Sequence, residues 1–327
     1  MIETNISIKE CHKILNKIKR EVSKVLVGQT DIIDGILRGM LANGHVLVEG
    51  VPGIAKTLVI RALGEATGCA TKRIQFTVDL LPTDIMGLTA YDEKKGFYTV
   101  KGPIFANFII ADEINRSPPK TQSALLEAMQ EKQVTLGKET FPLPKPFFVM
   151  ANNNPIEASG VYPLPEAQID RFLFKLYMDY PPAKDLRNII EKNISLRHFE
   201  EYGIKSVASP DKILAMQKIV REKIKHTDKI KDYIVRLVNA TRETKKYNIT
   251  LGKYIEWGAS PRAAIGLFIG AKADALLKSQ SYIAPQNVKN VIHDVLRHRI
   301  VLNYKGQAEG IKSDYIIDEI AKKVPFS

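Results

Sequence analysis

Eight consecutive residues have the types and the spacing of a phosphate-binding loop: Gly50-Val51-Pro52-Gly53-Ile54-Ala55-Lys56-Thr57. The glycines let main-chain N–H groups turn toward a phosphate, the lysine adds a positive charge for the terminal phosphates, and the threonine hydroxyl is a ligand for Mg²⁺. The generic pattern has glycine where Ala55 stands, and alanine serves there if its dihedral angles are right-handed. Taken alone, the segment also suits a Gly-Pro turn that enters an ordinary helix.

An acidic pair, Asp112-Glu113, ends an apolar stretch downstream of this loop. In a phosphohydrolase the first carboxylate can hold Mg²⁺ and the second can polarise the attacking water. Acidic pairs at strand ends are common, so their position after four apolar residues favours the catalytic interpretation. Asn154 follows the next apolar stretch and can hydrogen-bond the γ-phosphate or the water, although three adjacent asparagines also suit a turn.

Two arginines, Arg171 and Arg262, are further candidates, the second at the start of a predicted helix. An arginine that stands alone in a sequence usually lies on the solvated surface of the protein. A phosphoryl-transfer transition state gains most from a planar, always charged guanidinium, which favours a functional interpretation in a phosphate-binding protein.

Strands that alternate with helices must position these residues. The apolar patterns predict strands over 45–49, 72–76, 108–113 and 147–151, and helices over 8–26, from 31, over 58–66 and over 121–132. An inserted hairpin or irregular element is expected over 87–102 and a second hairpin over 134–142. This order predicts an α/β fold with a parallel sheet and a ligand at the carboxyl ends of its strands.

The alternation breaks at Tyr180-Pro181-Pro182-Ala183, which predicts a domain boundary: a nucleotide-binding α/β core with an N-terminal helix over 1–184 and a helical domain over 185–327. Helical periodicity follows over 212–224, 228–244, 261–277 and 284–300. We expect this second part to form a lid on the nucleotide.

Composition excludes several classes of protein. The 327 residues contain no run of 18 apolar residues that could span a membrane, and the first residues lack the apolar core of a signal peptide, so a cytoplasmic location is expected. Two cysteines, Cys11 and Cys69, support neither a disulfide framework nor a zinc site.

The positive charge is concentrated in the C-terminal part of the chain. Residues 1–184 hold 22 Lys and Arg against 20 Asp and Glu, whereas residues 185–327 hold 26 against 16. A basic domain can face nucleic acid or an acidic protein. Solvated lysine-rich helix faces are the simpler interpretation, because no aromatic residues alternate with the lysines over 212–231.

From about residue 27 to residue 299 the chain resembles the MoxR branch of the AAA+ ATPases. The motifs that carry the resemblance are Val27-Gly28-Gln29, the phosphate loop, Arg73-Ile74-Gln75-Phe76-Thr77, Asp79-Leu80-Leu81-Pro82, Asp112-Glu113-Ile114-Asn115-Arg116, Pro118-Pro119-Lys120-Thr121-Gln122, Leu164-Pro165-Glu166-Ala167-Gln168, Asp170-Arg171-Phe172 and Gly258-Ala259-Ser260-Pro261-Arg262. Ala55 is normal for this branch. Val78 and Asn152-Asn153 depart from the residues that are usual in it.

The resemblance implies an AAA+ αβα ATPase core with a small, mostly helical lid, assembled as a homo-oligomeric ring that is usually a hexamer. It implies that ATP and Mg²⁺ are bound, with Lys56 at the β- and γ-phosphates, Thr57 and Asp112 at Mg²⁺, and Glu113 activating water. Asn154 matches sensor 1, Arg171 the arginine finger that acts on the neighbouring subunit's ATP, and Arg262 sensor 2. Val27, Gly28 and Gln29 would lie near the adenine.

The expected function is that of a chaperone-like ATPase that remodels, assembles or activates protein complexes, with partners that in this family often carry von Willebrand factor A domains. A ring motor on nucleic acid is a weaker hypothesis, because the hairpin over 134–142 offers only Lys138 as a cation. A metal-chelatase motor subunit and a nucleotide-gated scaffold without turnover are also compatible with this type of core. The presence of Glu113, Asn154 and Arg171 argues against the scaffold.

Overall fold

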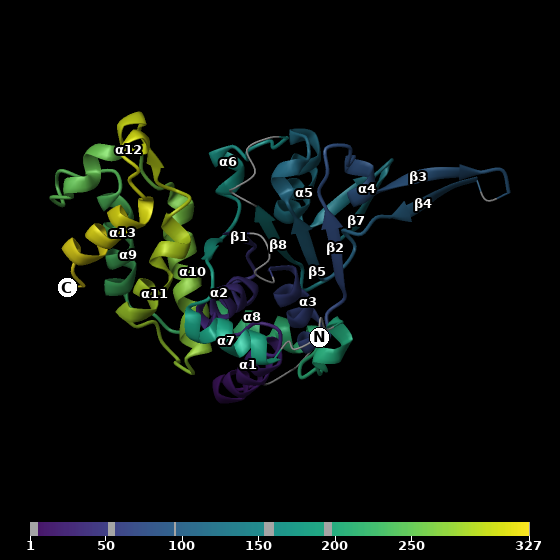
Figure 1. Ribbon diagram of the computed structural model, residues 1–327, viewed down its shortest axis with the longest axis horizontal. Coiled ribbons are helices and arrows are strands. Elements are labelled where there is room, and N and C mark those ends of the chain that lie inside the picture. The colour runs from purple at the N-terminus through teal and green to yellow at the C-terminus, as the bar shows by residue number, and fades with distance from the viewer. Residues whose placement is uncertain (1–5, 52–55, 95, 154–159, 193–197, 327) are drawn as a thin grey trace.

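A five-stranded parallel sheet forms the centre of the first part of the chain (Figure 1). The computed structural model describes residues 6–51, 56–94, 96–153, 160–192 and 198–326. The strand order is β2-β5-β8-β1-β9, and every pairing between neighbours is parallel. The strands are β1 (Val46–Gly50), β2 (Thr71–Gln75), β5 (Phe108–Asp112), β8 (Phe148–Asn153) and β9 (Phe174–Met178). The predicted parallel α/β fold is therefore confirmed.

The three inner strands of this sheet, β5, β8 and β1, are buried on both faces. In β5 all five residues are buried: Phe108 and Ile110 pack into one apolar cluster, and Ile109 and Ala111 into a second cluster on the other face. The first cluster includes residues of α1 (Ile8–Val22), α2 (Thr30–Leu41) and α3 (Lys56–Thr67), and the second includes residues of α5 (Pro119–Glu131). Side chains of a strand alternate between the two faces, so a short, wholly apolar strand fits a sheet covered on both sides.

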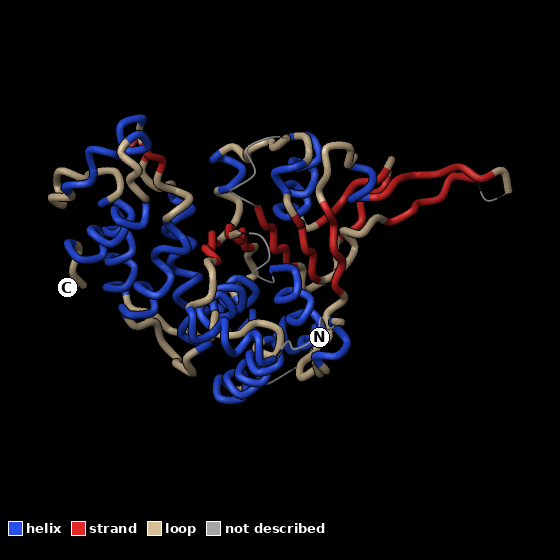
Figure 2. The backbone as a smooth tube through the Cα atoms, viewed as in Figure 1, coloured by secondary structure: helices blue, strands red, loops and turns tan. Residues whose placement is uncertain are grey.

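Two hairpins interrupt the alternation of strands and helices. The first, β3 (Gly87–Asp92) with β4 (Gly96–Lys101), follows the short helix α4 (Pro82–Met86) and projects far from the body of the molecule (Figure 2). The second pairs β6 (Gln133–Leu136) with β7 (Glu139–Pro142). Both predicted hairpins are thus confirmed.

The C-terminal part is mostly helical. It contains α7 (Ala183–Lys192), α8 (Pro210–Glu222), α9 (Asp228–Ala240), α10 (Pro261–Leu277), α11 (Pro285–Leu296), α12 (Tyr304–Ala308) and α13 (Ser313–Lys323), with a small antiparallel pair of β10 (Ile255–Trp257) and β11 (Val301–Leu302). Helix α10 is buried along most of its length and packs against α2, α8, α9 and α11. Short 3-10 helices lie at Ile114–Arg116, Phe199–Tyr202 and Thr250–Tyr254. The boundary after residue 184 stays a prediction.

A buried polar network joins the helical part to the core. The Arg38 guanidinium of α2 donates to the carboxylate of Asp274 in α10 over 2.9 Å, and Asp274 has no exposed side-chain surface. Asn287 and Asn290 of α11 donate to the other carboxylate oxygen. A buried carboxylate is tolerated when such partners surround it, so this network fixes how α10 and α11 pack on α2. In the described part of the chain, no helix is long and apolar enough to cross a lipid bilayer.

Candidate active site

The two ends of the phosphate loop lie where β1 stops and α3 starts. Residues 52–55 of the predicted loop, Pro52 to Ala55, lie outside the described residues, whereas Gly50, Val51, Lys56 and Thr57 lie within them. The Lys56 ammonium group donates to the main-chain oxygens of Gly50 at 2.6 Å and Asn153 at 3.4 Å. It therefore lies across the carboxyl ends of β1 and β8, at the N-terminus of a helix whose dipole favours an anion.

Asp112 ends β5 with a buried carboxylate that has partners from three neighbouring elements. Its Oδ2 accepts a hydrogen bond from the Thr57 hydroxyl at 3.2 Å and one from Arg73 Nε at 2.9 Å. Its Oδ1 accepts a hydrogen bond from the Asn152 side chain. A carboxylate and a hydroxyl in contact are oxygen donors of the kind that Mg²⁺ prefers, so Thr57 and Asp112 fit the predicted metal site.

Glu113 has a left-handed backbone conformation, with φ 56° and ψ 51°. Such a conformation is uncommon for a residue other than glycine and is held here by the Asn152 side-chain oxygen, which accepts from the Glu113 N–H at 2.7 Å. The Glu113 carboxylate accepts from Gln75 at 2.8 Å and from Arg116 at 3.1 Å. Strand β2 therefore contacts both carboxylates, Asp112 through Arg73 and Glu113 through Gln75. Asn154, the remaining candidate near the phosphates, lies outside the described residues.

The segment Val27-Gly28-Gln29 lies at the same edge of the sheet as the phosphate loop. Gln29 donates to the main-chain oxygen of Asp179, the residue after β9, at 2.8 Å, and β9 pairs with β1 up to Gly50. Gly28 has φ 82°, and an added Cβ would lie 1.9 Å from the carboxylate of Asp185 in α7. Only glycine fits there, which keeps this segment against the beginning of α7.

Arg171 and Arg262 lie at the opposite edge of the sheet. Arg171 precedes β9, and the N–H of Leu173 donates to His45 O, just before β1. Arg262 is the second residue of α10, and its guanidinium lies 3.3 Å from the Asp170 carboxylate. The length of β1 separates this edge from Gly50, four steps of about 3.3 Å or roughly 13 Å. Neither arginine therefore lies beside Lys56 of its own chain.

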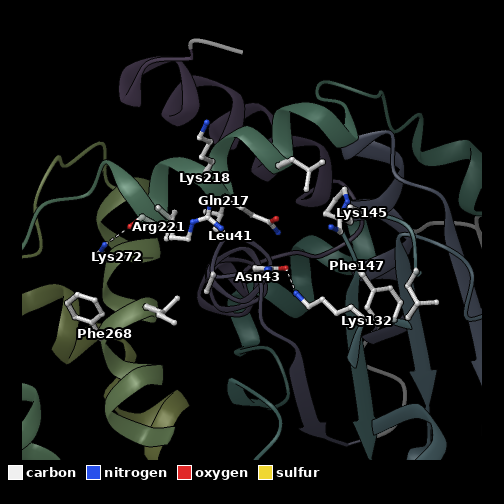
Figure 3. A pocket seen from close by; sticks show the side chains of 16 residues that line it. Leu41, Asn43, Lys132, Lys145, Phe147, Gln217, Lys218, Arg221, Phe268 and Lys272 are labelled. Atoms are coloured by element: carbon white, nitrogen blue, oxygen red, sulfur yellow. Dashed lines mark hydrogen bonds between the residues drawn. The ribbon is translucent and has the colours of Figure 1, made fainter. Parts of the chain in front are cut away.

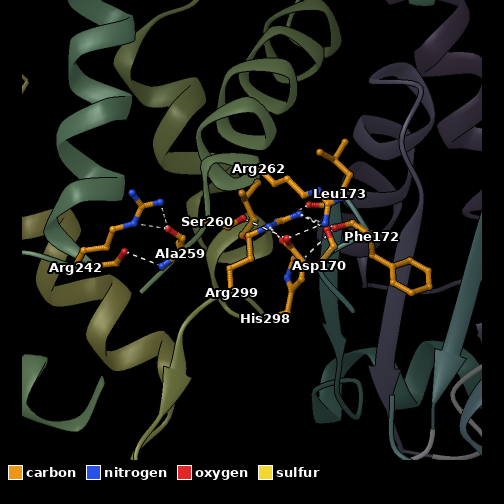
Figure 4. A network of polar contacts seen from close by, with 11 residues as sticks. Asp170, Phe172, Leu173, Arg242, Ala259, Ser260, Arg262, His298 and Arg299 are labelled. Carbon is orange, nitrogen blue, oxygen red and sulfur yellow. Dashed lines mark hydrogen bonds and ion pairs between the residues drawn. The ribbon is translucent and has the colours of Figure 1, made fainter. Parts of the chain in front are cut away.

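A polar network centred on Asp170 holds Arg262 in place (Figure 4). The Asp170 carboxylate accepts from Arg299 at 2.6 Å and from the Ser260 hydroxyl at 3.2 Å, in addition to Arg262. The Arg299 side chain is almost fully buried and also donates to Phe172 O at 2.8 Å. This network ties the chain before β9 to the start of α10. In the described part of the chain, the exposed side chain of Arg171 makes no hydrogen bond or ion pair.

The geometry thus divides the predicted residues into two groups. Lys56, Thr57, Asp112 and Glu113 meet at the carboxyl edge, whereas Arg171 and Arg262 meet at the amino edge. The position of Arg262 differs from what a lid folded over its own phosphate loop predicts, because Asp170 and Ser260 hold the start of α10 beside the chain that enters β9.

Sequence reasoning gave no role to four residues that contact the acidic pair: Arg73, Gln75, Arg116 and Asn152. A signal was present for two of them. Arg73 and Gln75 lie two residues apart on one short strand, so both side chains point to the same face of it and together indicate a polar contact on that face.

Comparisons with known proteins agree with this architecture. Residues 45–174 match the model of the ATPase family associated with various cellular activities (AAA), and residues 251–320 match the model of the AAA lid domain. The chain is 45% identical to Chaperone MoxR1 of Mycobacterium tuberculosis, over 93% of this chain and 80% of that protein. It is 27% identical to Protein MoxR of Methylorubrum extorquens, over 88% and 87% of the two chains. A crystal structure of a protein from Cytophaga hutchinsonii, assigned as an ATPase, superposes with a TM-score of 0.90 at 42% identity and covers 98% of this chain and 97% of its own.

Proposed function

The chain belongs to the MoxR family of AAA+ ATPases, and on that premise we propose that it hydrolyses ATP at sites shared between neighbouring subunits of a ring. The observation that carries the proposal is the separation of the functional residues into two groups at opposite edges of one sheet. One edge offers a phosphate loop with an acidic pair, and the opposite edge offers two arginines. Each group is half of a phosphoryl-transfer site, and a head-to-tail ring brings the two halves together.

At the carboxyl edge, Lys56 neutralises the terminal phosphates and Glu113 accepts a proton from the attacking water. Thr57 and Asp112 hold Mg²⁺, which when bound offsets the negative charge of the phosphate oxygens. Gln75 and Arg116 both donate to Oε2 of Glu113, so Oε1 is the oxygen that accepts the proton of the attacking water. Asn152 keeps the main chain of Glu113 in place.

At the amino edge, Arg171 and Arg262 supply positive charge to the transition state of the neighbouring subunit. The exposed Arg171 suits a residue whose partner belongs to another chain, and the neighbouring Asp170 holds Arg262 at the same edge. We expect the ring to be a hexamer.

The work done by this turnover is, in our proposal, the remodelling, assembly or activation of protein complexes. The support is similarity to a relative named as a chaperone, of which this chain covers 80%. Clients are proteins, and partners with von Willebrand factor A domains fit the family.

Substitution of the arginines tests the shared site. Arg171→Ala should leave ATP affinity nearly unchanged and lower turnover by about 10³–10⁵-fold, the contribution of arginine fingers in phosphoryl transfer. Arg187→Ala is the matched control, because Arg187 is an exposed arginine at 85% side-chain accessibility, outside both groups. Affinity is measured by calorimetry and turnover by phosphate release. Normal turnover in Arg171→Ala would contradict the proposed role.

A further inference from the structure

A cavity of about 650 Å³ lies among five segments (Figure 3), and none of the described residues of the phosphate loop lines it. Its walls come from the end of α2, the end of α5, the segment over 143–147 that leads into β8, one side of α8 and the middle of α10. This volume is within the range of small-molecule sites in proteins, roughly 300–1,000 Å³.

The lining is strongly basic. It contains five cationic side chains and no carboxylate: Lys132, Lys145, Lys218, Arg221 and Lys272. Arg221 pairs with Glu222, which is outside the lining. The four lysines make no ion pair in the described part of the chain. The cavity therefore gathers positive charge that the protein itself leaves largely unneutralised.

Two of the lysines are fixed in place by neutral acceptors. The Lys132 ammonium donates to the side-chain oxygen of Asn43 at 2.8 Å, and the Lys272 ammonium donates to the main-chain oxygen of Arg221 at 2.8 Å, as Figure 3 shows. Lys272 is only 7% exposed. Burial of a charged group costs free energy unless an opposite charge accompanies it, so an anion in the cavity would be stabilised by these ammonium groups.

The pKa values of two of these lysines also indicate a site that lacks an anion. Burial lowers the pKa of Lys272, and burial together with the charge of Lys145 lowers the pKa of Lys132. Both shifts are those of ammonium groups that lack a counter-ion. Binding of an anion would reverse them.

We propose that this cavity is a binding site for a small phosphorylated molecule, separate from the phosphate loop. Lysine is a compact point charge with three donors that binds phosphate groups well, and several lysines together are attracted more strongly to a multiply charged phosphate than to a single carboxylate. The rings of Phe147 and Phe268, on two of the walls, offer apolar surface to the rest of such a molecule. A chain of nucleic acid or protein fits less well, because the cationic side chains line a cavity of small-molecule size.

The site is tested in a Lys56→Ala background, which removes the cation of the phosphate loop. Calorimetry with inorganic pyrophosphate should detect binding, and the substitutions Lys132→Gln and Lys272→Gln together should weaken it by roughly tenfold for each lysine. The matched control carries Lys229→Gln and Lys289→Gln, two exposed lysines outside the cavity, and loses the same charge. Its affinity should stay within twofold.

A second measurement leaves the cavity residues unchanged and therefore does not depend on how the cavity variants fold. In the Lys56→Ala protein, pyrophosphate should slow acetylation of Lys145 and Lys218, which are exposed at the cavity, but not that of Lys229 and Lys289. ADP is the comparison ligand: tighter binding of ADP that Lys132→Gln and Lys272→Gln together weaken identifies a nucleotide as the ligand of the cavity, and binding of pyrophosphate alone identifies a phosphate without a base. Absence of binding by both, or equal weakening in the control variant, would overturn the proposal.

Discussion

A buried histidine at the amino edge of the sheet makes the stability of the fold depend on pH. His45 Nδ1 accepts the Val149 N–H at 3.0 Å, so Nε2 carries the proton and donates it to Met129 O at 3.1 Å. Both nitrogens of the neutral ring are thus used. Burial, reinforced by the charge of Lys132, lowers the pKa of His45 to about 4 from its ordinary value of 6.5.

The sign and size of the effect follow from these two pKa values. Above pH 6.5 His45 is neutral in the folded and the unfolded chain, and its full contribution to stability is present. As the pH falls toward 4, His45 becomes protonated in the unfolded chain, whereas the buried ring of the folded chain stays mostly neutral. Linkage between protonation and folding gives a loss of about 2 kcal/mol at pH 5 and about 3 kcal/mol at pH 4.

The variant His45→Gln isolates this contribution. A glutamine can accept from Val149 and donate to Met129 but does not titrate in this range. The free energy of unfolding is measured by urea titration of both proteins between pH 7.5 and 4, and the difference between them removes the contributions of the remaining titratable groups. We expect the wild type to lose about 3 kcal/mol more than the variant by pH 4. A difference that stays constant across this range would refute the reasoning.

Three further predictions concern the site and the joint between the two parts of the chain. Lys56→Ala should abolish ATP binding in calorimetry, because the loop loses the cation that neutralises the terminal phosphates. Glu113→Gln should keep ATP affinity and lower steady-state turnover by roughly 10²–10⁴-fold, the usual contribution of a general base, and normal turnover would place the base elsewhere. Arg38→Ala removes the guanidinium from the buried Asp274 carboxylate, which keeps its contacts with Lys278, Asn287 and Asn290, and should cost about 1.5–3 kcal/mol in urea unfolding, compared with little change for Arg187→Ala.

Much of the fold could be predicted because its strongest patterns are local. The bounds of α10 agree with the predicted helix over 261–277, whose start Ser260-Pro261 marks. The sequence does not predict strand β9, because Lys175 interrupts its apolar pattern. The Lys175 ammonium group pairs with the carboxylate of Glu49 at 2.7 Å, and Glu49 is far away in the sequence. Helix α7 was missed because it begins directly after Pro181-Pro182, which predicted a break.

The candidate site, like the fold, could be predicted only where its sequence signals are local. The phosphate loop and the acidic pair have local sequence signals, and the structure places Lys56, Thr57, Asp112 and Glu113 together. The contact of Asn152 with the acidic pair depends on β8 lying beside β5, a fact of strand order. The separation of Arg171 from Lys56 likewise depends on the direction of β9 beside β1.

Complementation between two inactive proteins tests the shared site most directly. In a ring that mixes Arg171→Ala with Lys56→Ala subunits, some interfaces join the intact phosphate loop of the first variant to the intact Arg171 of the second. Native mass spectrometry must first show that mixed rings form. If Arg171 acts on the neighbouring subunit, ATP turnover should return on mixing, with a maximum at an intermediate ratio. Turnover that stays at the level of the separate variants at every ratio would contradict a site shared between subunits.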